Sequence, residues 1–294
     1  MHKQGADPQP GRGPGVVVVT GASTGIGRAS ALLLAELGHV VYAGVRQEEH
    51  GEELRKEAGA GAKLHPLILD VTERDHVVAA AERVRAELNG LPFTGLVNNA
   101  GIAVAAPLEF LPMDDLRDQF EVNVIGQVAM SQAFLPILRD YKGRLVYVGS
   151  VSGLVASRML GAYSASKFAL EAVADAFRRE LKPHGVGVSL VEPGRIATPI
   201  WDKSLEEGRA RLEAMGPQAR EYYGAVVEEL VDSAKDASVK GTPAMAVARA
   251  VVRALSDRRL RTRYFVGADA HIVNVMRRVM PDPMLDRIIS ATRR

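Results

Sequence analysis

Short apolar runs recur along the chain and alternate with longer segments in which apolar residues return every three or four positions. The first run, at 16–19, holds only valine, a β-branched residue that favours extended backbone and fills the interior of parallel sheets. Residues 29–37 then show helical spacing. We predict strands at 16–20, 39–45, 63–69, 95–98, 144–149, 186–191 and 263–266, with helical segments between them.

This alternation predicts an α/β fold: one doubly wound parallel sheet of about seven strands, with helices on both faces. No boundary between domains is visible, so we expect a single domain over residues 15–294. The proline- and glycine-containing polar stretch 1–14 is interpreted as a disordered leader. Residues 199–242 interrupt the rhythm. They are predicted to form a substrate loop or lid, the alternative being two surface helices packed on the domain.

A glycine-rich turn joins the first strand to the first helix and reads Thr20-Gly21-Ala22-Ser23-Thr24-Gly25-Ile26-Gly27. Backbone approaches a pyrophosphate closely where Cβ atoms are missing, and a helix N-terminus offers free N–H groups. The Gly-x-x-x-Gly-x-Gly spacing differs from the commonest dinucleotide fingerprint. The turn predicts a phosphate site, the alternative being a tight strand–helix turn that binds nothing.

Tyr163 and Lys167 lie four residues apart in a predicted helix, and Ser150 precedes Tyr163 by thirteen positions. Residues at this helical spacing share a face, which places the ammonium beside the phenol. A phenol ordinarily loses its proton near pH ~10, and a neighbouring cation lowers that pKa. Such a pair alone usually occupies a solvated helix face. Together with Ser150 and the glycine turn, it predicts a site of hydride transfer.

These motifs, in this order, resemble those of the short-chain dehydrogenases/reductases, a family of Rossmann-fold oxidoreductases. The resemblance rests on Thr20-Gly21-x-x-x-Gly25-Ile26-Gly27, Asn98-Asn99-Ala100-Gly101, the set Asn123, Ser150, Tyr163 and Lys167, and Pro193-Gly194-Arg195-Ile196-Ala197-Thr198. It extends from residue 15 to about residue 267. The segments at 120–124, 163–170 and 191–194 are most similar to the retinol and hydroxysteroid dehydrogenase branch.

The resemblance implies that Asn123, Ser150, Tyr163 and Lys167 are catalytic. In reduction Tyr163 would protonate the substrate oxygen and Ser150 would polarise the carbonyl. Lys167 would lower the pKa of the phenol and hold the nicotinamide ribose, while Asn123 would position a water that links Lys167 to solvent. Ser152 is a nearby alternative to Ser150, and Asn123 read alone could be a structural helix residue.

The resemblance also implies a set of cofactor-binding residues at the carboxyl ends of the strands. They are Gly21, Ser23, Thr24, Gly25, Ile26, Gly27, Arg46, Asp70, Val71, Asn98, Ala100, Gly101, Tyr163, Lys167, Pro193, Gly194, Ile196 and Thr198. Asp70, with Val71, resembles the family's contact to the adenine ring; alternatively it caps a helix near Thr72 and Glu73.

The end of the second strand decides between the two nicotinamide dinucleotides. A carboxylate there would bind the adenosine ribose hydroxyls of NAD, and a cation would bind the extra phosphate of NADP. The chain has Val45 and Arg46 at these positions, with no carboxylate before Glu48. A guanidinium grips phosphate well. We therefore predict NADP(H) rather than NAD(H), unless Arg46 is an ordinary exposed loop residue.

The expected substrate walls contain few charges. They comprise the lid, with Trp201, Leu205, Leu212, Met215, Tyr222, Tyr223, Val226 and Val227, and the segments 103–108 and 154–160. We therefore expect a lipophilic alcohol or ketone of steroid, retinoid or long-chain type. Arg195 leaves a 3-oxoacyl-thioester as the enzymatic alternative. A non-catalytic dinucleotide-binding regulator is the alternative from another class, and the four filled catalytic positions oppose it.

Composition argues against nucleic-acid partners, metal sites and membrane-spanning segments. The formal net charge is +2, which argues against a nucleic-acid surface, and Arg258, Arg259, Arg261 and Arg263 are interpreted as a solvated helix end and strand start. The absence of cysteine excludes disulfides and thiolate metal sites, and no histidine pair has metal-ligand spacing. No metal is expected. No apolar run approaches the ~20 residues that cross a bilayer, so we expect a cytoplasmic protein.

Two further expectations concern assembly. By analogy with the family, a homodimer or homotetramer would form through the helical segments 113–138 and 162–181. The tail 269–294 has an apolar face interrupted by Pro281 and Pro283. It could cap the pocket, mediate self-association or dock on a membrane surface, with core packing as the simplest reading.

Overall fold

The computed structural model of the protein describes residues 13–197, 210 and 214–291. Its centre is a sheet of seven parallel strands in the order β3-β2-β1-β4-β5-β6-β9. The strands are β1 Val16–Val19, β2 Val40–Val45, β3 Leu64–Ile68, β4 Phe93–Asn98, β5 Arg144–Val148, β6 Gly187–Pro193 and β9 Arg263–Val266. The chain reverses its winding between β1 and β4, which is where ligands bind in such sheets.

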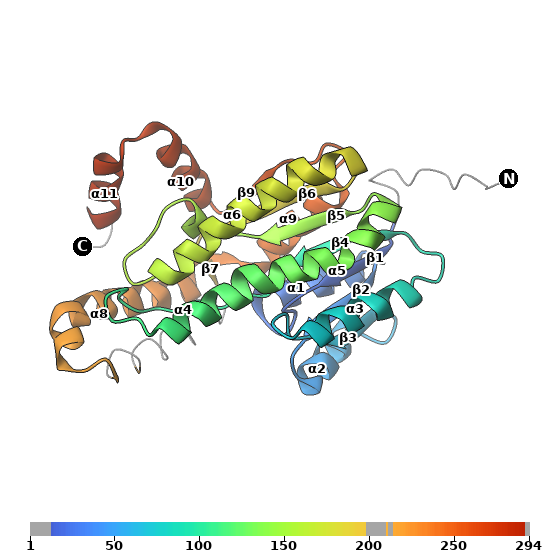
Figure 1. The fold of residues 1–294 in the computed structure, drawn as a ribbon, viewed down its shortest axis with the longest axis horizontal. Helices are drawn as coiled ribbons and strands as arrows, with labels where there is room; N and C mark the ends of the chain where they lie inside the picture. Colours follow the sequence, from blue (N-terminus) through green and yellow to red (C-terminus); the bar gives the residue numbers. More distant parts are fainter. Residues whose placement is uncertain (1–12, 198–209, 211–213, 292–294) are drawn as a thin grey trace.

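Helices cover both faces of this sheet, as Figure 1 shows. They are α1 Gly25–Glu36, α2 Glu48–Ala58, α3 Arg74–Ala86, α4 Met113–Phe120, α5 Gly126–Tyr141, α6 Gly161–Leu181, α8 Pro217–Lys240, α9 Ala244–Ser256, α10 Ala268–Val279 and α11 Asp282–Ala291. Two 3₁₀ turns, η2 Val151–Gly153 and η3 Lys182–His184, flank α6. The sequence-based prediction of an α/β fold with about seven strands is confirmed.

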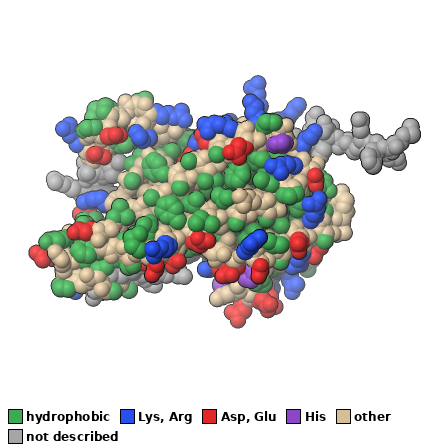
Figure 2. All heavy atoms as spheres, viewed as in Figure 1, with side chains coloured by type: hydrophobic (Ala, Val, Ile, Leu, Met, Phe, Trp, Pro, Cys, Tyr) green, Lys and Arg blue, Asp and Glu red, His purple; other side chains and the backbone are tan. Residues whose placement is uncertain are grey.

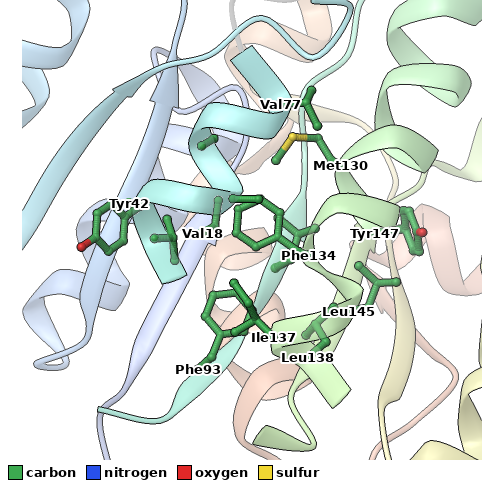
Figure 3. Packing of buried hydrophobic residues seen from close by; sticks show 14 of the residues in the cluster. Val18, Tyr42, Val77, Phe93, Met130, Phe134, Ile137, Leu138, Leu145 and Tyr147 are labelled. Atoms are coloured by element: carbon green, nitrogen blue, oxygen red, sulfur yellow. The ribbon is translucent and has the colours of Figure 1, made fainter. Parts of the chain in front are cut away.

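Alternation of side chains along the strands divides the core in two. In β1, Val16 and Val18 face a cluster completed by α3, α5 and α6, whereas Val17 and Val19 face one completed by α1, α2 and α9. All four valines are fully buried, as expected for a parallel strand covered on both faces. Figure 3 shows the first cluster, in which the rings of Phe93 and Phe134 stack at 5.8 Å between centroids.

The long helix expected at 113–138 is interrupted by one π-helical turn, η1 Glu121–Ile125. Such turns inside α-helices occur often at functional sites because they change which side chains face inward. Here the turn carries Asn123, which is fully buried. No spacing in the sequence distinguishes this turn from regular helix.

A two-residue bridge links the sheet to the predicted lid. The strand β7 Ile196–Ala197 pairs in parallel with β8 Thr242–Pro243, so the chain between them leaves and returns at one place. Of the predicted lid, α8 is described, and Trp201, Leu205 and Leu212 lie outside the described residues. Residues 1–12 of the predicted leader 1–14 also lie outside the described residues.

The C-terminal helices α10 and α11 extend beyond the carboxyl ends of the strands (Figure 1). Ala270 and Leu285 are buried, but Ile272, Val275 and Val279 are 58%, 57% and 70% exposed. The tail is therefore only partly packed as a core element. Among the helices that the structure describes, none is both long and apolar enough to cross a membrane.

Candidate active site

The glycine turn has the backbone that a phosphate cradle needs. Gly21 and Gly25 have φ of 64° and 57°, in the left-handed region that favours glycine. Gly27 has a different reason to be glycine, because a Cβ there would lie 2.1 Å from the carbonyl oxygen of Gly21. No side chain caps the start of α1, and its first turn contains no acid. The free N–H groups of this helix start can therefore receive an anion.

Two residues outside the predicted cofactor set hold this turn in place. The side-chain amide of Asn99 donates to the carbonyl oxygens of Thr20 and Gly21, at 2.9 and 3.0 Å. The hydroxyl of Thr20 accepts from the backbone N–H groups of Asn99 and Ala100. The turn after β1 is thus tied to the end of β4. Both residues belong to recognised sequence motifs, but only the fold shows that they bind each other.

The predicted residues after β4 take different positions. Asn98 is fully buried and donates to Ser131 and to the carbonyl of Gln127 in α5, so its side chain lies in the core and not in the crevice. Ala100 adjoins Gly21, and Gly101 is exposed beside Asn123. Neighbouring residues of a strand point to opposite faces, which separates Asn98 from Asn99.

The predicted adenosine end brings Arg46 and Asp70 together. Arg46 is exposed after β2, Val45 is buried, and Glu48 already belongs to α2. Burial works against ionisation of Asp70, but hydrogen bonds from the N–H and hydroxyl of Thr72 and the charge of Arg46 hold its pKa below the ordinary value. Asp70 caps the turn before α3 and not the helix itself, whose N-cap is Glu73. The neighbouring residue, Val71, packs in the core against Gly126.

The predicted catalytic side chains meet where β5 ends and α6 begins. Tyr163 and Lys167 are 7% and 5% exposed, and the ammonium of Lys167 lies 5.8 Å from the centre of the Tyr163 ring. Ser150, at the end of β5, is also buried. It accepts from the backbone N–H of Ser152, so the rival serine serves here to orient Ser150.

Burial dominates the protonation of this group. It raises the pKa of Tyr163 to about 12, against a hydrogen bond with Ser150 that lowers it. It lowers the pKa of Lys167 to about 8, against the charge of Glu192, which raises it. The ammonium donates to the carbonyl oxygen of Val148 at 2.9 Å. The cation beside the phenol is therefore held by the backbone of β5.

Asn123 is fixed by hydrogen bonds that use its whole amide. Its side-chain oxygen accepts from the N–H of Ile102, and its nitrogen donates to the carbonyl of Ile102 and to the hydroxyl of Ser166. Ser166 lies on α6 beside Lys167. The side chain of Asn123 therefore joins the π-helical turn to the loop after β4 and to α6.

A loop after β6 forms the predicted nicotinamide end. Pro193 ends β6, Gly194 follows, and Ile196 is buried in β7; Thr198 lies outside the described residues. Asp269, in the first turn of α10, accepts from the N–H of Arg195 at 2.6 Å. A Cβ on Gly194 would lie 2.2 Å from the carboxylate of Asp269. This contact, which the sequence analysis missed, ties the loop to the C-terminal helices.

The expected substrate walls come together beside Tyr163. Ala103, Ala105 and Leu160 form an apolar cluster with Tyr163, and Leu230 of α8 packs on it. The two predicted walls are joined by a hydrogen bond from the N–H of Ala106 to the carbonyl of Met159. A second apolar cluster lies farther along α8. Its buried members are Ala219, Val227 and Val231 of α8 and Met159 of the loop before α6, and it includes Phe110 and Tyr223. The surroundings of the phenol are thus apolar.

The model of the short chain dehydrogenase family matches residues 15–209. That span contains the glycine turn, the buried Tyr163 and Lys167, and the loop after β6. The chain belongs to the short-chain dehydrogenases/reductases. It is an oxidoreductase of alcohol or carbonyl groups, for which a nicotinamide dinucleotide is the expected cofactor.

Curated relatives of this dehydrogenase have diverse substrates. The 3-amino-tetrahydro-pyrrolizinone reductase of Xenorhabdus hominickii is 39% identical over 86% of this chain and 87% of its own. The NADPH-dependent 3-dehydrocapnine reductase of Ornithobacterium rhinotracheale is 33% identical over 92% and 94%. The mouse retinol dehydrogenase 5 is 33% identical over 93% and 87%. The expected likeness to the retinol and hydroxysteroid branch is confirmed.

Solved structures agree with the fold. A Burkholderia phymatum short-chain dehydrogenase/reductase in complex with NAD has a TM-score of 0.75 and 26% identity, covering 91% of this chain and 92% of its own. A Burkholderia cenocepacia enzyme in complex with NADP has a TM-score of 0.72 and 27% identity, covering 94% and 97%. Relatives of this fold therefore bind either dinucleotide.

Proposed function

We propose that this dehydrogenase interconverts a lipophilic ketone or aldehyde and the corresponding alcohol, with NADP(H) as the hydride donor or acceptor. The observation that carries the proposal is the buried group of Ser150, Tyr163 and Lys167, which lies in apolar surroundings at the same end of the sheet as the glycine turn. A hydroxyl, a phenol and an ammonium in this arrangement provide acid–base groups for a substrate oxygen.

The residues present fit a dinucleotide. The two left-handed glycines and the uncapped start of α1 suit a pyrophosphate. At the other end of the site, Gly194 and Ile196 lie next to β6 and border the place expected for the nicotinamide. When bound, the dinucleotide supplies or accepts the hydride at the substrate carbon.

Side chains of the protein supply the proton and stabilise the charges that develop during the reaction. In reduction, Tyr163 gives its phenolic proton to the developing alkoxide, and Ser150 donates a hydrogen bond to the same oxygen. Lys167 makes the phenolate less costly through its charge. Asn123, whose amide is fully engaged, keeps the π-helical turn against α6 and the loop after β4.

We propose NADP(H) in preference to NAD(H) because of Arg46. It stands at the end of β2, with no acidic residue before Glu48 in the sequence, and its positive charge lowers the pKa of Asp70. A guanidinium there would pair with the 2′-phosphate of NADP. The NADPH-dependent relative is consistent with this preference.

The substrate class follows from the walls of the site. Ala103, Ala105, Leu160 and Leu230 offer only apolar surface beside Tyr163. Arg158, which could have received an acidic substrate, pairs with Glu229 of α8 at 3.1 Å. A retinol dehydrogenase and a hydroxysteroid dehydrogenase among the relatives agree with a lipophilic substrate.

We also propose that the protein forms a homodimer or homotetramer through the outer face of α5 and α6. The helical stretches 126–138 and 161–174 carry no exposed charged residue: Lys167 and Glu171 are their charged residues, and both are buried. Figure 2 shows hydrophobic side chains gathered over these helices. Ile125 and Phe168 are 52% and 42% exposed on this face. Uncharged apolar surfaces of this kind often mark interfaces.

The test is separate titration of the purified protein with NADPH and NADH, followed by turnover of steroid, retinoid, long-chain and acyl-thioester carbonyls. We expect tighter binding of NADPH and turnover of an apolar ketone or aldehyde. Tyr163→Phe should abolish turnover while leaving NADPH affinity within about twofold, because the phenyl ring keeps its packing but has no proton to give.

Arg46→Ala serves as the cofactor control. It should weaken NADPH binding about tenfold or more and leave NADH binding nearly unchanged, since a charged hydrogen bond is worth roughly 1.5–3 kcal/mol. Equal loss for both nucleotides would contradict NADP selectivity. Tight nucleotide binding without turnover of any carbonyl would favour a regulator, and turnover of acyl-thioesters alone would favour the thioester reductase.

A further inference from the structure

A buried carboxyl group lies behind the hydride-transfer site and has no part in the proton transfer described above. Glu192, the residue before Pro193 in β6, is fully buried. Its carboxyl group lies against the backbone of Gly149, where a Cβ would come within 2.5 and 2.6 Å of the two carboxyl oxygens. The glycine before Ser150 therefore makes room for an acid directly behind the catalytic serine.

The partner of this acid is a second carboxyl group, that of Glu171 in α6. Among the described residues, both oxygens of Glu192 and one oxygen of Glu171 are buried without a hydrogen-bond donor. The other oxygen of Glu171 accepts from Arg263 at 2.9 Å. Two ionised carboxylates cannot satisfy each other, whereas one shared proton turns two of the orphan oxygens into a donor and an acceptor.

The surrounding charges agree with a neutral Glu192. Burial, above all, and then the hydrogen bond and charge of Glu171 raise its pKa well above the ordinary value, against Lys167 and Arg263. Arg263 is already paired with Glu171 and with Asp175, at 3.4 Å to the latter. Its charge is therefore shared between two carboxylates, and its effect on Glu192 is smaller than the effects of burial and of Glu171.

The two carboxyl groups lie in line with the catalytic residues. Tyr163, Lys167, Glu171 and Asp175 follow one another at intervals of four along α6, and so share one face of the helix. Asp175 is paired with Arg178 and Arg179 at the outer end of this row. On β9 the facing charge is Arg263. On α10 the nearest acid, Asp269, is engaged by the N–H of Arg195.

An ionised Glu192 would change both catalytic groups, because its charge raises the pKa of Tyr163 and of Lys167. It would thus oppose the effect of Lys167 on the phenol. A neutral Glu192 has no such effect on either group.

We propose that Glu192 is a positioning residue for hydride transfer: as a neutral acid it donates a hydrogen bond to Glu171, so that Glu192 places no negative charge beside Lys167 and Tyr163. The functional half of this inference rests on the function proposed above. The shared proton itself does not, and it can be measured without any turnover.

The first experiment is infrared spectroscopy of the wild-type protein carrying ¹³C-labelled glutamate carboxyl groups, at about pH 7.5. We expect a carbonyl band of a protonated glutamic acid, at a pH where exposed glutamates are ionised. The band should vanish in Glu192→Gln and persist in Glu180→Gln, a matched change at an exposed position of α6. Absence of the band from the wild-type protein overturns the proposal, whatever the variants do.

The second experiment is the pH profile of alcohol oxidation, whose alkaline rise reports ionisation of the phenol. Glu192→Gln replaces a neutral acid by a neutral amide that can still donate to Glu171, so the midpoint should stay within about 0.2 pH units. Glu171→Gln removes a negative charge that raises the pKa of Glu192 and leaves Arg263 without its Glu171 partner, and both changes favour the ionised form of Glu192. Glu192 then ionises, and the midpoint should rise by roughly 0.5 unit or more.

The opposite shifts decide against the proposal. If Glu192 is ionised in the native protein, Glu192→Gln removes a negative charge and the midpoint falls. If Glu171→Gln leaves the midpoint unchanged, the pair does not act on Tyr163. A protein that shows the infrared band but turns over no carbonyl would refute the proposed function while retaining the carboxyl pair.

Discussion

At the scale of single residues, the main feature of the site is that two ionisable side chains are buried together, which destabilises their charged forms. Lys167 and Tyr163 are almost inaccessible to solvent. Burial raises the pKa of Tyr163 and lowers that of Lys167, so it favours the neutral form of each. A dinucleotide ribose would add hydrogen-bond partners for the ammonium of Lys167, which in the free protein donates to Val148. Catalytic groups commonly cost stability in this way.

Lys167→Met should therefore stabilise the free protein near neutral pH. The pKa of Lys167 falls from 10.5 to about 8 on folding, so between these values the unfolded chain binds more protons and the wild type gains stability as pH rises. Methionine has no such dependence. The stability advantage of the variant should shrink by about 2 kcal/mol between pH ~7 and ~9.5, at about 1.4 kcal/mol per pKa unit.

The measurement is urea unfolding of both proteins without nucleotide, at several pH values in that range. The lost hydrogen bond to Val148 costs the variant the same at every pH, so it offsets the advantage without changing its slope. If the difference in unfolding free energy between the two proteins does not vary with pH, burial does not lower the pKa of Lys167. Tyr163 does not contribute to the difference, because its pKa of about 12 keeps the folded phenol protonated over this range and the unfolded chains titrate alike.

Residue roles were predictable where a motif carries them and not where two distant residues meet. Tyr163, Lys167 and Ser150 have fixed spacings in the sequence, and the structure brings them together. Asp269 and Arg195 are 74 positions apart, and Glu171 and Glu192 lie on different elements. No local pattern signals such pairs, since their contact is set by the packing of α10 and α6 on the sheet.

At the scale of elements, the loop after β6 depends on a helix that follows it by more than seventy residues. Asp269 of α10 binds the N–H of Arg195, and Thr242 of β8 donates its backbone N–H to the carbonyl of the same residue. The loop is thereby fixed from both sides. The strands themselves were predicted within about two residues, because each contains a short run of mostly apolar residues that the sheet buries. The π-helical turn and the β7–β8 bridge were not predicted, because each involves too few residues to produce a period.

Asp269→Ala should weaken NADPH binding about tenfold, because it removes a charge-assisted hydrogen bond that holds the loop beside the nicotinamide position. Asp269→Asn keeps an acceptor and should lose less. Asp282→Ala, at an exposed acid in the first turn of α11, is the matched control and should bind normally. Nucleotide titration of the three variants checks this. Equal affinity in all of them would show that the contact from α10 to the loop does not affect cofactor binding.

At the scale of the whole molecule, the uncharged face of α5 and α6 is opposite to the side of the sheet covered by α1 and α9, and runs beside the site. Tyr163 and Lys167, the proposed catalytic residues, are buried on the inner side of α6. Association through this face would therefore support α6 from outside while Tyr163 and Lys167 act on its inner side.

Ala172→Glu should convert the native oligomer to monomers. Ala172 is exposed on α6, and in a twofold-symmetric interface the same surface occurs twice, so the substitution introduces two carboxylates into the interface. The control is Ile272→Glu, which adds the same charge to the exposed face of α10. Light scattering of both variants and the wild type gives the masses. A wild-type monomer, or an unchanged mass for Ala172→Glu, would contradict the proposed interface.

The bridge between β7 and β8 has a consequence for how this chain could diversify. The predicted lid lies between β7 and β8, which pair with each other, and neither strand belongs to the seven-stranded sheet. A stretch inserted at a single point can be exchanged without disturbing the scaffold beneath it. We expect the predicted substrate lid to be replaceable as a unit: a chimera that carries the corresponding segment of a relative should accept other substrates while the reaction stays the same.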